Sequence, residues 1–202
     1  MTKANSIPDP SSMAASGEVK GVQIRAVYMF LKERYGDEAV TAAMNALSPE
    51  DRLLMPTMLL DSNWYPHEIW RVIRRISRAL DPYAGTDLTV TMGRYMAEYS
   101  FKGVYRSFLT PDPVKQVEKF RWIHDFFYKN VCGIEARPMG DCSAVVSYYY
   151  EKGMTVTGAT CVLLMGFWTR TLELSGAKEV SASHPKCVSK GADRCEYSFN
   201  WQ

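Results

Sequence analysis

Four side chains able to bind a metal ion occur in the last quarter of the chain. They are Cys161, His184, Cys187 and Cys195, and the last three lie within twelve residues. Thiolate sulfur and imidazole nitrogen are ligands that Zn²⁺ prefers, and structural zinc sites hold four of them in a tetrahedron. Because three sulfurs and one nitrogen complete such a set, leaving no position open for a catalytic water, the pattern predicts a structural zinc site.

The same residues also allow an interpretation without metal. Free cysteine is among the most often buried residue types, and the spacing here is not the C-x-x-C of common zinc knuckles. Three buried thiols near a surface histidine would then need no ion. The other two cysteines, Cys132 and Cys142, are interpreted as packing residues, and the odd total of five argues against a disulfide framework.

A further residue with chemical potential is His124. It shares one face of a strongly aromatic helix with Val117, Phe120, Ile123 and Phe127. Three roles are open for its imidazole: a core histidine bonded to neighbouring groups, a ligand of haem iron, or a polar contact in a ligand pocket.

Aromatic residues are abundant, at 12% of the chain, which is enough to line an apolar cavity. We expect such a cavity to bind a small hydrophobic or aromatic ligand. The candidate lining residues are Trp122, His124, Phe127, Tyr148 and Tyr150. Successive side chains of a strand point to opposite faces, so only some of the tyrosines at 148–150 can face one cavity. Ordinary core packing is the alternative for each of them.

No catalytic motif accompanies these residues. The sequence has no nucleophile elbow, no Walker loop, no dinucleotide-binding glycine fingerprint and no HExxH helix. The adjacent acids Glu50 and Asp51 are explained as residues at the start of a helix. We therefore expect a protein that is not an enzyme.

Size and charge set further bounds. The chain has 202 residues, 47% hydrophobic and 23% charged, which suits one domain with a buried core. Its net charge of +2 gives no strongly basic field, so we expect no nucleic-acid partner. The longest wholly apolar run, residues 161–168, is too short to cross a bilayer, and no signal-peptide pattern opens the sequence. We expect a cytoplasmic protein without a membrane span.

Helical patterns dominate the first two thirds of the chain. Residues 1–17, rich in Pro and Ser, are expected to form a disordered tail. Helices are predicted at 24–35, 37–47, 53–60, from Pro66 to Leu80, at 88–109 with a bend near Gly103, and from Asp112 to Asn130. The four arginines at 71, 74, 75 and 78 are interpreted as a solvated helix face.

The remaining third mixes strands with one long helix. Strands at 133–139 and 142–150 form a hairpin, a helix spans 158–175, and a second hairpin closes the chain. In its last strand Cys195, Tyr197 and Phe199 alternate with polar residues, which places the cysteine on the buried side. The predicted fold class is α+β, with a helical part at 18–130 packed on a C-terminal antiparallel sheet and helix at 131–202, in one structural domain.

The segment from Cys161 to Trp201, which ends in HPxCxxxGxxxCxYxxxW, resembles the 4-vinyl reductase domain, a small-molecule-binding module used as the sensor of phenol-sensing transcriptional activators. That resemblance implies zinc ligands in the order Cys, acidic residue, Cys, Cys. The matching positions are Cys161, His184, Cys187 and Cys195, with His184 in place of the carboxylate. Histidine and carboxylate side chains can both bind zinc, so the replacement preserves a possible ligand.

Two broader resemblances concern the whole chain. Residues 34–38 (RYGDE), 62–66 (SNWYP) and 102–108 (KGVYRSF) resemble an uncharacterised bacterial family of stand-alone proteins, which has no known activity. The helical-then-α/β order is also distantly similar to the H-NOX gas-sensing haem domain, where a histidine comparable to His124 binds the iron. The Tyr-x-Ser-x-Arg element that holds the haem propionates in that family is replaced here by Tyr148-Tyr-Tyr-Glu-Lys-Gly-Met154.

These observations together predict a sensor or signalling domain with a structural zinc and a pocket for a small hydrophobic or aromatic ligand. A signal would have to pass through an unknown protein partner or through the interface of a homodimer. A scaffolding protein without a ligand and a haem-based gas sensor are the two alternatives.

Overall fold

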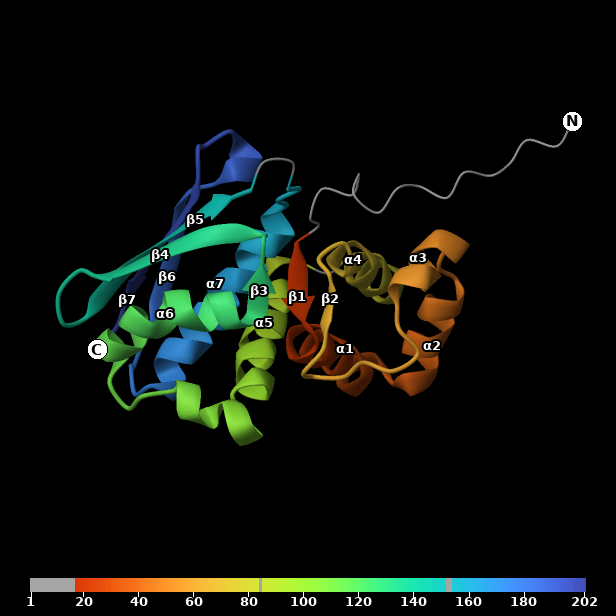
Figure 1. The fold of residues 1–202 in the computed structure, drawn as a ribbon, viewed down its shortest axis with the longest axis horizontal. Coiled ribbons are helices and arrows are strands. Elements are labelled where there is room, and N and C mark those ends of the chain that lie inside the picture. Colours follow the sequence, from red (N-terminus) through yellow and green to blue (C-terminus); the bar gives the residue numbers. More distant parts are fainter. Residues whose placement is uncertain (1–16, 84, 152–153) are drawn as a thin grey trace, which may run out of the picture.

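A helical part and a sheet-bearing part lie side by side in the computed structural model, which describes residues 17–83, 85–151 and 154–202 (Figure 1). The predicted tail at 1–17 falls almost wholly outside these residues. In the described ranges, no helix is both long enough and apolar enough to span a membrane.

Four helices form the N-terminal end. They are α1 (Gly21–Tyr35), α2 (Asp37–Asn45), α3 (Pro49–Leu54) and α4 (Ile69–Leu80). Ser48 caps α3, because its side chain accepts a hydrogen bond from the Asp51 amide at 3.2 Å, and Pro49 occupies the first turn. The buried Asp51 carboxylate then pairs with Arg71 and Arg75 of α4, which ties the two helices together.

Two further helices and a 3-10 turn lead to the sheet. They are α5 (Thr86–Ser100), the 3-10 helix η2 (Gly103–Phe108) and α6 (Pro113–Phe127). Asp112 caps α6 as predicted, accepting hydrogen bonds from the amides of Val114 at 3.0 Å and Lys115 at 3.1 Å.

The C-terminal part is a four-stranded antiparallel sheet in the order β4-β5-β7-β6, with α6 and α7 (Gly158–Leu174) on one face (Figure 1). Its strands are β4 (Cys132–Pro138), β5 (Ser143–Tyr150), β6 (Ser181–Lys186) and β7 (Cys195–Asn200), and η3 (Val188–Lys190) lies between the last two. Both predicted hairpins and the long helix are confirmed. Cys195, Tyr197 and Phe199 are fully buried, as their alternation predicted.

Helices α5 and α7 cross so closely that each presents a glycine at the contact. A Cβ atom on Gly93 would lie 2.1 Å from the Leu163 carbonyl oxygen, and one on Gly166 would lie 2.3 Å from that of Val90. Arg94, the residue after Gly93, also donates two hydrogen bonds to the Glu173 carboxylate near the end of α7, at 2.8 and 2.6 Å. Helices α5 and α7 therefore form one closely packed pair.

A small sheet was missed by the sequence analysis. Strand β1 (Glu18–Lys20) pairs with β2 (Trp64–Pro66) on one side and β3 (Tyr128–Lys129) on the other. Its strands have two or three residues each, too few to produce a detectable alternation. The predicted helix start at Pro66 is therefore wrong, because Pro66 ends an edge strand and α4 begins at Ile69.

Two other predicted helices are too long. The one placed at 53–60 is α3, which ends at Leu54, since Met55 precedes a proline and adopts an extended conformation with ψ 114°. The one placed at 88–109 ends at Ser100, and Gly103, with φ 58°, starts a separate 3-10 helix.

Candidate metal centre and ligand cavity

The four predicted metal ligands come together at one end of α7. Cys161 lies in its first turn, His184 in β6, Cys187 just after β6, and Cys195 opens β7. One ligand atom from each residue lies within 4.8 Å of the others, although up to 34 positions separate them in the chain. The three cysteines are buried and His184 is half-buried.

The distances between the sulfur atoms match a tetrahedral site. The Cys161 Sγ atom lies 3.7 Å from that of Cys187 and 3.6 Å from that of Cys195. A tetrahedron with Zn–S bonds of about 2.3 Å has edges of about 3.8 Å, whereas a disulfide needs an S–S distance of about 2.05 Å. These distances are compatible with a shared ion and too long for disulfides, and all three cysteines are free.

Neighbouring groups orient these ligands. The Val188 amide lies 3.3 Å from Cys195 Sγ, and the Ser189 hydroxyl lies 2.9 Å from Cys187 Sγ. The His184 ring stacks on Tyr197 at 4.4 Å, and its Nε2 atom is buried without a hydrogen-bond partner in the described part of the chain. A buried nitrogen without a partner is costly unless an unseen water or ion binds it. The donor set fits zinc.

A cavity of about 470 Å³ opens beside this centre, in the usual size range of small-molecule sites. Its walls come from α4, α5, the end of α6 with β3, the ends of β4 and β5, and the first turns of α7. The residues that line it are His67, Trp70, Ile73, Arg74, Ser77, Arg78, Asp81, Pro82, Thr89, Met92, His124, Tyr128, Val131, Cys132, Tyr148, Tyr150, Ala159, Thr160, Leu163 and Leu164.

His124 is the buried polar group at the inner wall. Its Nδ1 atom lies 3.1 Å from Asp125 Oδ1 and its Nε2 atom 3.2 Å from Cys132 Sγ. Its ring stacks on Tyr128 with centroids 5.2 Å apart. Burial lowers the pKa of His124 more strongly than the nearby Asp125 carboxylate raises it, so the imidazole is neutral near pH 7.

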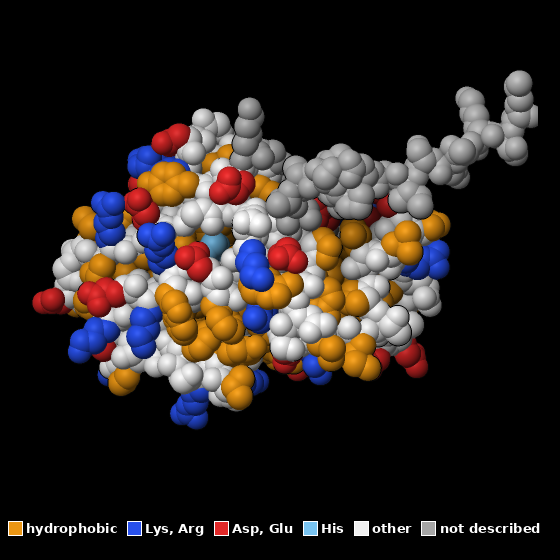
Figure 2. Space-filling view, viewed as in Figure 1, with side chains coloured by type: hydrophobic (Ala, Val, Ile, Leu, Met, Phe, Trp, Pro, Cys, Tyr) orange, Lys and Arg blue, Asp and Glu red, His pale blue; other side chains and the backbone are white. Residues whose placement is uncertain are grey.

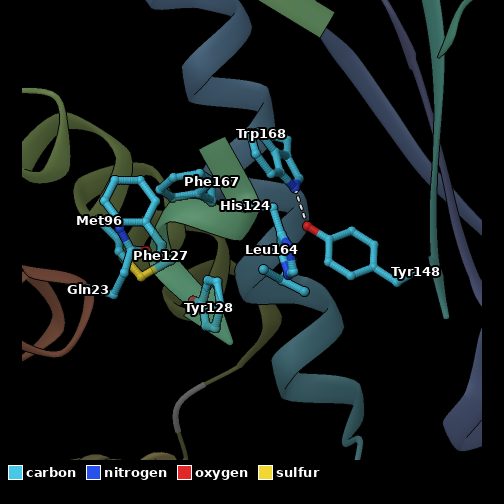
Figure 3. A pocket seen from close by; sticks show the side chains of 9 residues that line it. All are labelled: Gln23, Met96, His124, Phe127, Tyr128, Tyr148, Leu164, Phe167 and Trp168. Carbon is cyan, nitrogen blue, oxygen red and sulfur yellow. Dashed lines mark hydrogen bonds between the residues drawn. The ribbon is translucent and has the colours of Figure 1, made fainter. Parts of the chain in front are cut away.

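A second, much smaller void of about 10 Å³ lies on the inner side of His124, among side chains of α5, α6 and α7 (Figure 3). Figure 3 shows Phe127 and Phe167 on this side and the hydrogen bond that Trp168 Nε1 donates to Tyr148 Oη at 2.5 Å. The void has room for about one water molecule. The larger cavity is therefore the candidate ligand site.

The metal centre and the cavity share the same supporting residues. Ala159 and Thr160, in the turn that carries Cys161, line the cavity. Tyr148 lines it as well, and lies directly opposite Cys195 in the pairing of β5 with β7. An ion that holds Cys161 to Cys195 would therefore fix one wall of the cavity.

Only some of the predicted pocket residues reach this cavity. His124, Tyr148 and Tyr150 line it, and Phe127 lines the smaller void. Trp122 is 53% exposed and packs against Phe108 instead, because it lies on the outer face of α6. Of the two cysteines interpreted as packing residues, Cys132 lines the cavity and Cys142 is exposed.

Sequence reasoning missed the contribution of α4. Arg74 and Arg78 of this helix and His67 in the turn before it line the cavity, although the arginines were interpreted as a solvated face. The interpretation is confirmed for Arg75 and Arg78, which are exposed, but it is incomplete, because Arg71 and Arg75 also bind the buried Asp51. The available signal was the i, i+4 spacing within each of these two arginine pairs, which places each pair on one side of the helix.

No protein-family model matches the chain, and no curated protein matches it. The fold is nevertheless similar to solved H-NOX structures. An H-NOX protein from S. oneidensis in the Fe(II) ligation state, with three substitutions, has a TM-score of 0.67 and 14% identity, over 91% of this chain and 96% of that one. Unliganded Fe(II) H-NOX from K. algicida has a TM-score of 0.67 and 13% identity, over 91% and 96%. The α+β, H-NOX-like fold is thereby confirmed.

Proposed function

We propose that this chain is a sensor domain that binds a small molecule in the cavity beside His124. The observation that carries the proposal is the cavity itself: about 470 Å³, mostly apolar, with a buried neutral imidazole and a few charged groups. The described side chains do not fill this cavity. This supports a protein that binds a ligand more than a scaffolding protein whose core is filled by its own residues.

Haem is the first ligand class to consider, because solved structures with this fold include an H-NOX protein in the Fe(II) state and an H-NOX protein studied for heme distortion. These neighbours favour haem more than the aromatic ligand expected from sequence. His124 is the residue that would hold the iron. Asp125 lies within hydrogen-bond distance of its Nδ1 atom, which would leave Nε2 free to coordinate, a common arrangement for ligating histidines. Cys132 Sγ, 3.2 Å from Nε2, would have to move aside. A haem held there would supply iron for a gas ligand.

Absorbance tests this candidate directly. Purified protein mixed with hemin is expected to show a Soret band, and His124→Gln is expected to shift or abolish it. His67→Gln is the matched control, because His67 lines the same cavity from the turn that precedes α4. Equal spectra for the wild type and both variants would exclude His124 as the iron ligand.

A hydrophobic or aromatic molecule without iron is the second ligand class. It is supported by the apolar lining from Trp70, Ile73 and Leu164 and by the ring faces of Tyr128 and Tyr150. Native mass spectrometry after gentle purification is expected to reveal a bound organic mass with no haem absorbance. A mass equal to that of the bare chain, unchanged after incubation with hemin or with hydrophobic ligands, would contradict both classes.

We further infer that Cys161, His184, Cys187 and Cys195 bind one structural zinc. The sulfur spacing and the buried His184 nitrogen support this, as does the resemblance of the same residues to the 4-vinyl reductase motif. Elemental analysis is expected to find one zinc per chain. A metal-free protein that melts at the same temperature with and without strong chelator would contradict the inference.

We also propose that the chain forms a homodimer, which would pass the signal to a protein partner. Light scattering coupled to size-exclusion chromatography tests the dimer. A molecular mass near the 22.9 kDa of one chain, with and without ligand, would argue against it.

A further inference from the structure

The arginines of α4 divide into two pairs with different surroundings. Arg71 and Arg75 face Asp51, with Arg71 Nη1 3.1 Å from its carboxylate. Arg74 and Arg78, also one turn apart, line the cavity instead. In the described part of the chain neither of these two forms an ion pair, so the structure gives their charges no acidic partner.

Of the two cavity arginines Arg74 is the more buried, whereas Arg78 is exposed to solvent. Arg74 is half-buried, and burial followed by the charges of Arg78 and Arg71 lowers its pKa. The acid in the lining, Asp81, accepts hydrogen bonds from Tyr35 Oη and the Tyr83 amide, both at 3.2 Å, and forms no ion pair with either arginine. The half-buried Arg74 charge, next to the like charge of Arg78 and without a counter-ion, therefore costs stability, which is typical of sites kept for binding.

Besides polar neutral side chains, the rest of the lining offers an apolar surface and one helix N-terminus with partial positive charge. Ala159 and Thr160 lie in the first turn of α7, a helix of 17 residues whose N-terminal end carries the positive end of its dipole. The apolar surface comes from Trp70, Ile73, Met92, Val131, Leu163 and Leu164. A matching molecule has an oxyanion at one end and an apolar body at the other.

We propose that the ligand of this cavity is an amphipathic organic acid whose oxyanion is bound by Arg74 and Arg78. The proposal rests on the proposed function, namely that the cavity binds a small molecule, and names the chemical class of that molecule. The planar guanidinium groups bind carboxylate and phosphate oxygens through paired hydrogen bonds. The carboxylates of haem and those of free organic acids share this chemistry.

The test compares acids with neutral molecules of the same shape. Decanoate is titrated against 1-decanol by calorimetry, and hemin against its dimethyl ester by absorbance, with wild type, Arg74→Gln and Arg78→Gln. Arg52→Gln is the control, since Arg52 is exposed on α3 and lies outside the cavity. The first pair of ligands reports on a free acid and the second on haem.

At least one acid is expected to bind the wild type tenfold or more tightly than its neutral counterpart. Each cavity arginine variant is expected to lose about tenfold in affinity for that acid, equal to about 1.4 kcal/mol, with no change for the neutral molecule. Arg52→Gln is expected to bind as the wild type does. The melting temperature of Arg74→Gln is expected to equal or exceed that of the wild type, because a repulsive charge is removed, so lost binding cannot be ascribed to unfolding.

Two results would overturn the inference. Equal affinity for acid and neutral molecule, or unchanged acid binding in both cavity variants, would show that the arginines do not select the ligand, and the proposed function would stand. No binding of any of the four molecules would overturn the inference and the proposed function together.

Discussion

Single residues at the metal centre and the cavity are placed by contacts that reach far along the chain. Cys161 meets Cys195 at 3.6 Å across 34 positions, and His124 meets Cys132 at 3.2 Å at the end of α6. At both places a sulfur lies close to another potential ligand atom. The two places differ in what surrounds the sulfur. Cys161 belongs to a cluster of four potential ligands, whereas His124 and Cys132 line the cavity.

Replacing one donor of the metal centre should release the ion. In Cys187→Ser we expect zinc content to fall well below one per chain. The melting temperature should fall by roughly 10 °C, as expected for losing at least about 3 kcal/mol in a chain of this size. Cys142→Ser, at an exposed site, is the control and should match the wild type in both measurements. Full zinc content with unchanged melting in Cys187→Ser would remove Cys187 from the ligand set.

The stability of the protein should depend on His67 below neutral pH. Burial lowers the pKa of His67 to about 4, despite the opposing charge of Glu68. A histidine whose pKa is lower in the folded state than the usual 6.5 contributes stability that is fully present above pH 6.5 and is lost as the pH falls towards 4. We expect this residue to account for about 1 to 3 kcal/mol of that loss, after allowance for solvent screening.

Chemical denaturation of wild type and His67→Gln at pH 8, 7, 6 and 4.5 measures the effect. The free energies of unfolding of the wild type and of His67→Gln should differ by a constant amount between pH 7 and 8. Between pH 6.5 and 4.5 the free energy of unfolding should fall further in the wild type than in the variant. Parallel curves over the whole range would show that His67 is not responsible.

At the scale of elements, the crossing of α5 over α7 is the contact that positions the cavity. Thr89 and Met92 of α5 and Leu163 and Leu164 of α7 line it, next to Gly93 at the crossing. The backbones approach so closely that neither Gly93 nor Gly166 has room for a methyl group. The shape of the pocket therefore depends on two residues that contribute no side chain.

Alanine at either glycine should destabilise the protein although it favours a helix. Intrinsic propensity alone would make Gly93→Ala or Gly166→Ala more stable by about 1 kcal/mol. The clash with the Leu163 or Val90 carbonyl should reverse this sign and cost about 2 to 4 kcal/mol, lowering the melting temperature by roughly 5 to 15 °C. Gly158→Ala, at the start of α7 with open space around it, is the matched control and should be neutral or slightly stabilising. Equal melting temperatures for all three variants would show that the backbones of α5 and α7 do not approach so closely.

At the scale of the whole molecule, the cavity lies where the helical part meets the sheet-bearing part. Helix α4 contributes its arginines from the first part, and β5 with α7 contributes tyrosines and the helix start from the second (Figure 1). One face of the protein also combines basic and acidic side chains with an apolar area (Figure 2). A ligand in the cavity would contact both parts at once and so change how firmly they are held together.

Ligand binding should therefore stabilise the whole fold. A ligand at one hundred times its dissociation constant adds about 2.7 kcal/mol, which should raise the melting temperature by roughly 5 to 10 °C. Ala159→Trp narrows the cavity and should abolish the shift. Ala79→Trp, on the exposed side of α4 outside the cavity, should retain it. An equal shift in both tryptophan variants would place the ligand elsewhere.

Local patterns were sufficient for most elements. Ser48-Pro49 and Asp112-Pro113 fixed two helix starts, and the alternation of Cys195, Tyr197 and Phe199 fixed the buried side of β7. These features depend on neighbouring residues alone, so the sequence determines them. The four candidate metal ligands were singled out by their residue types, although only the fold brings the Cys161 sulfur to within 3.7 Å of the other two.

The cavity was decided by tertiary structure. The i, i+4 spacing in α4 groups Arg71 with Arg75 and Arg74 with Arg78. It does not show which pair meets a buried carboxylate and which lines a cavity. Likewise, Trp122 and His124 lie two positions apart on one helix and so point to different sides. Long-range packing determines which side of a helix faces a cavity, and that packing follows from contacts between residues distant in the chain.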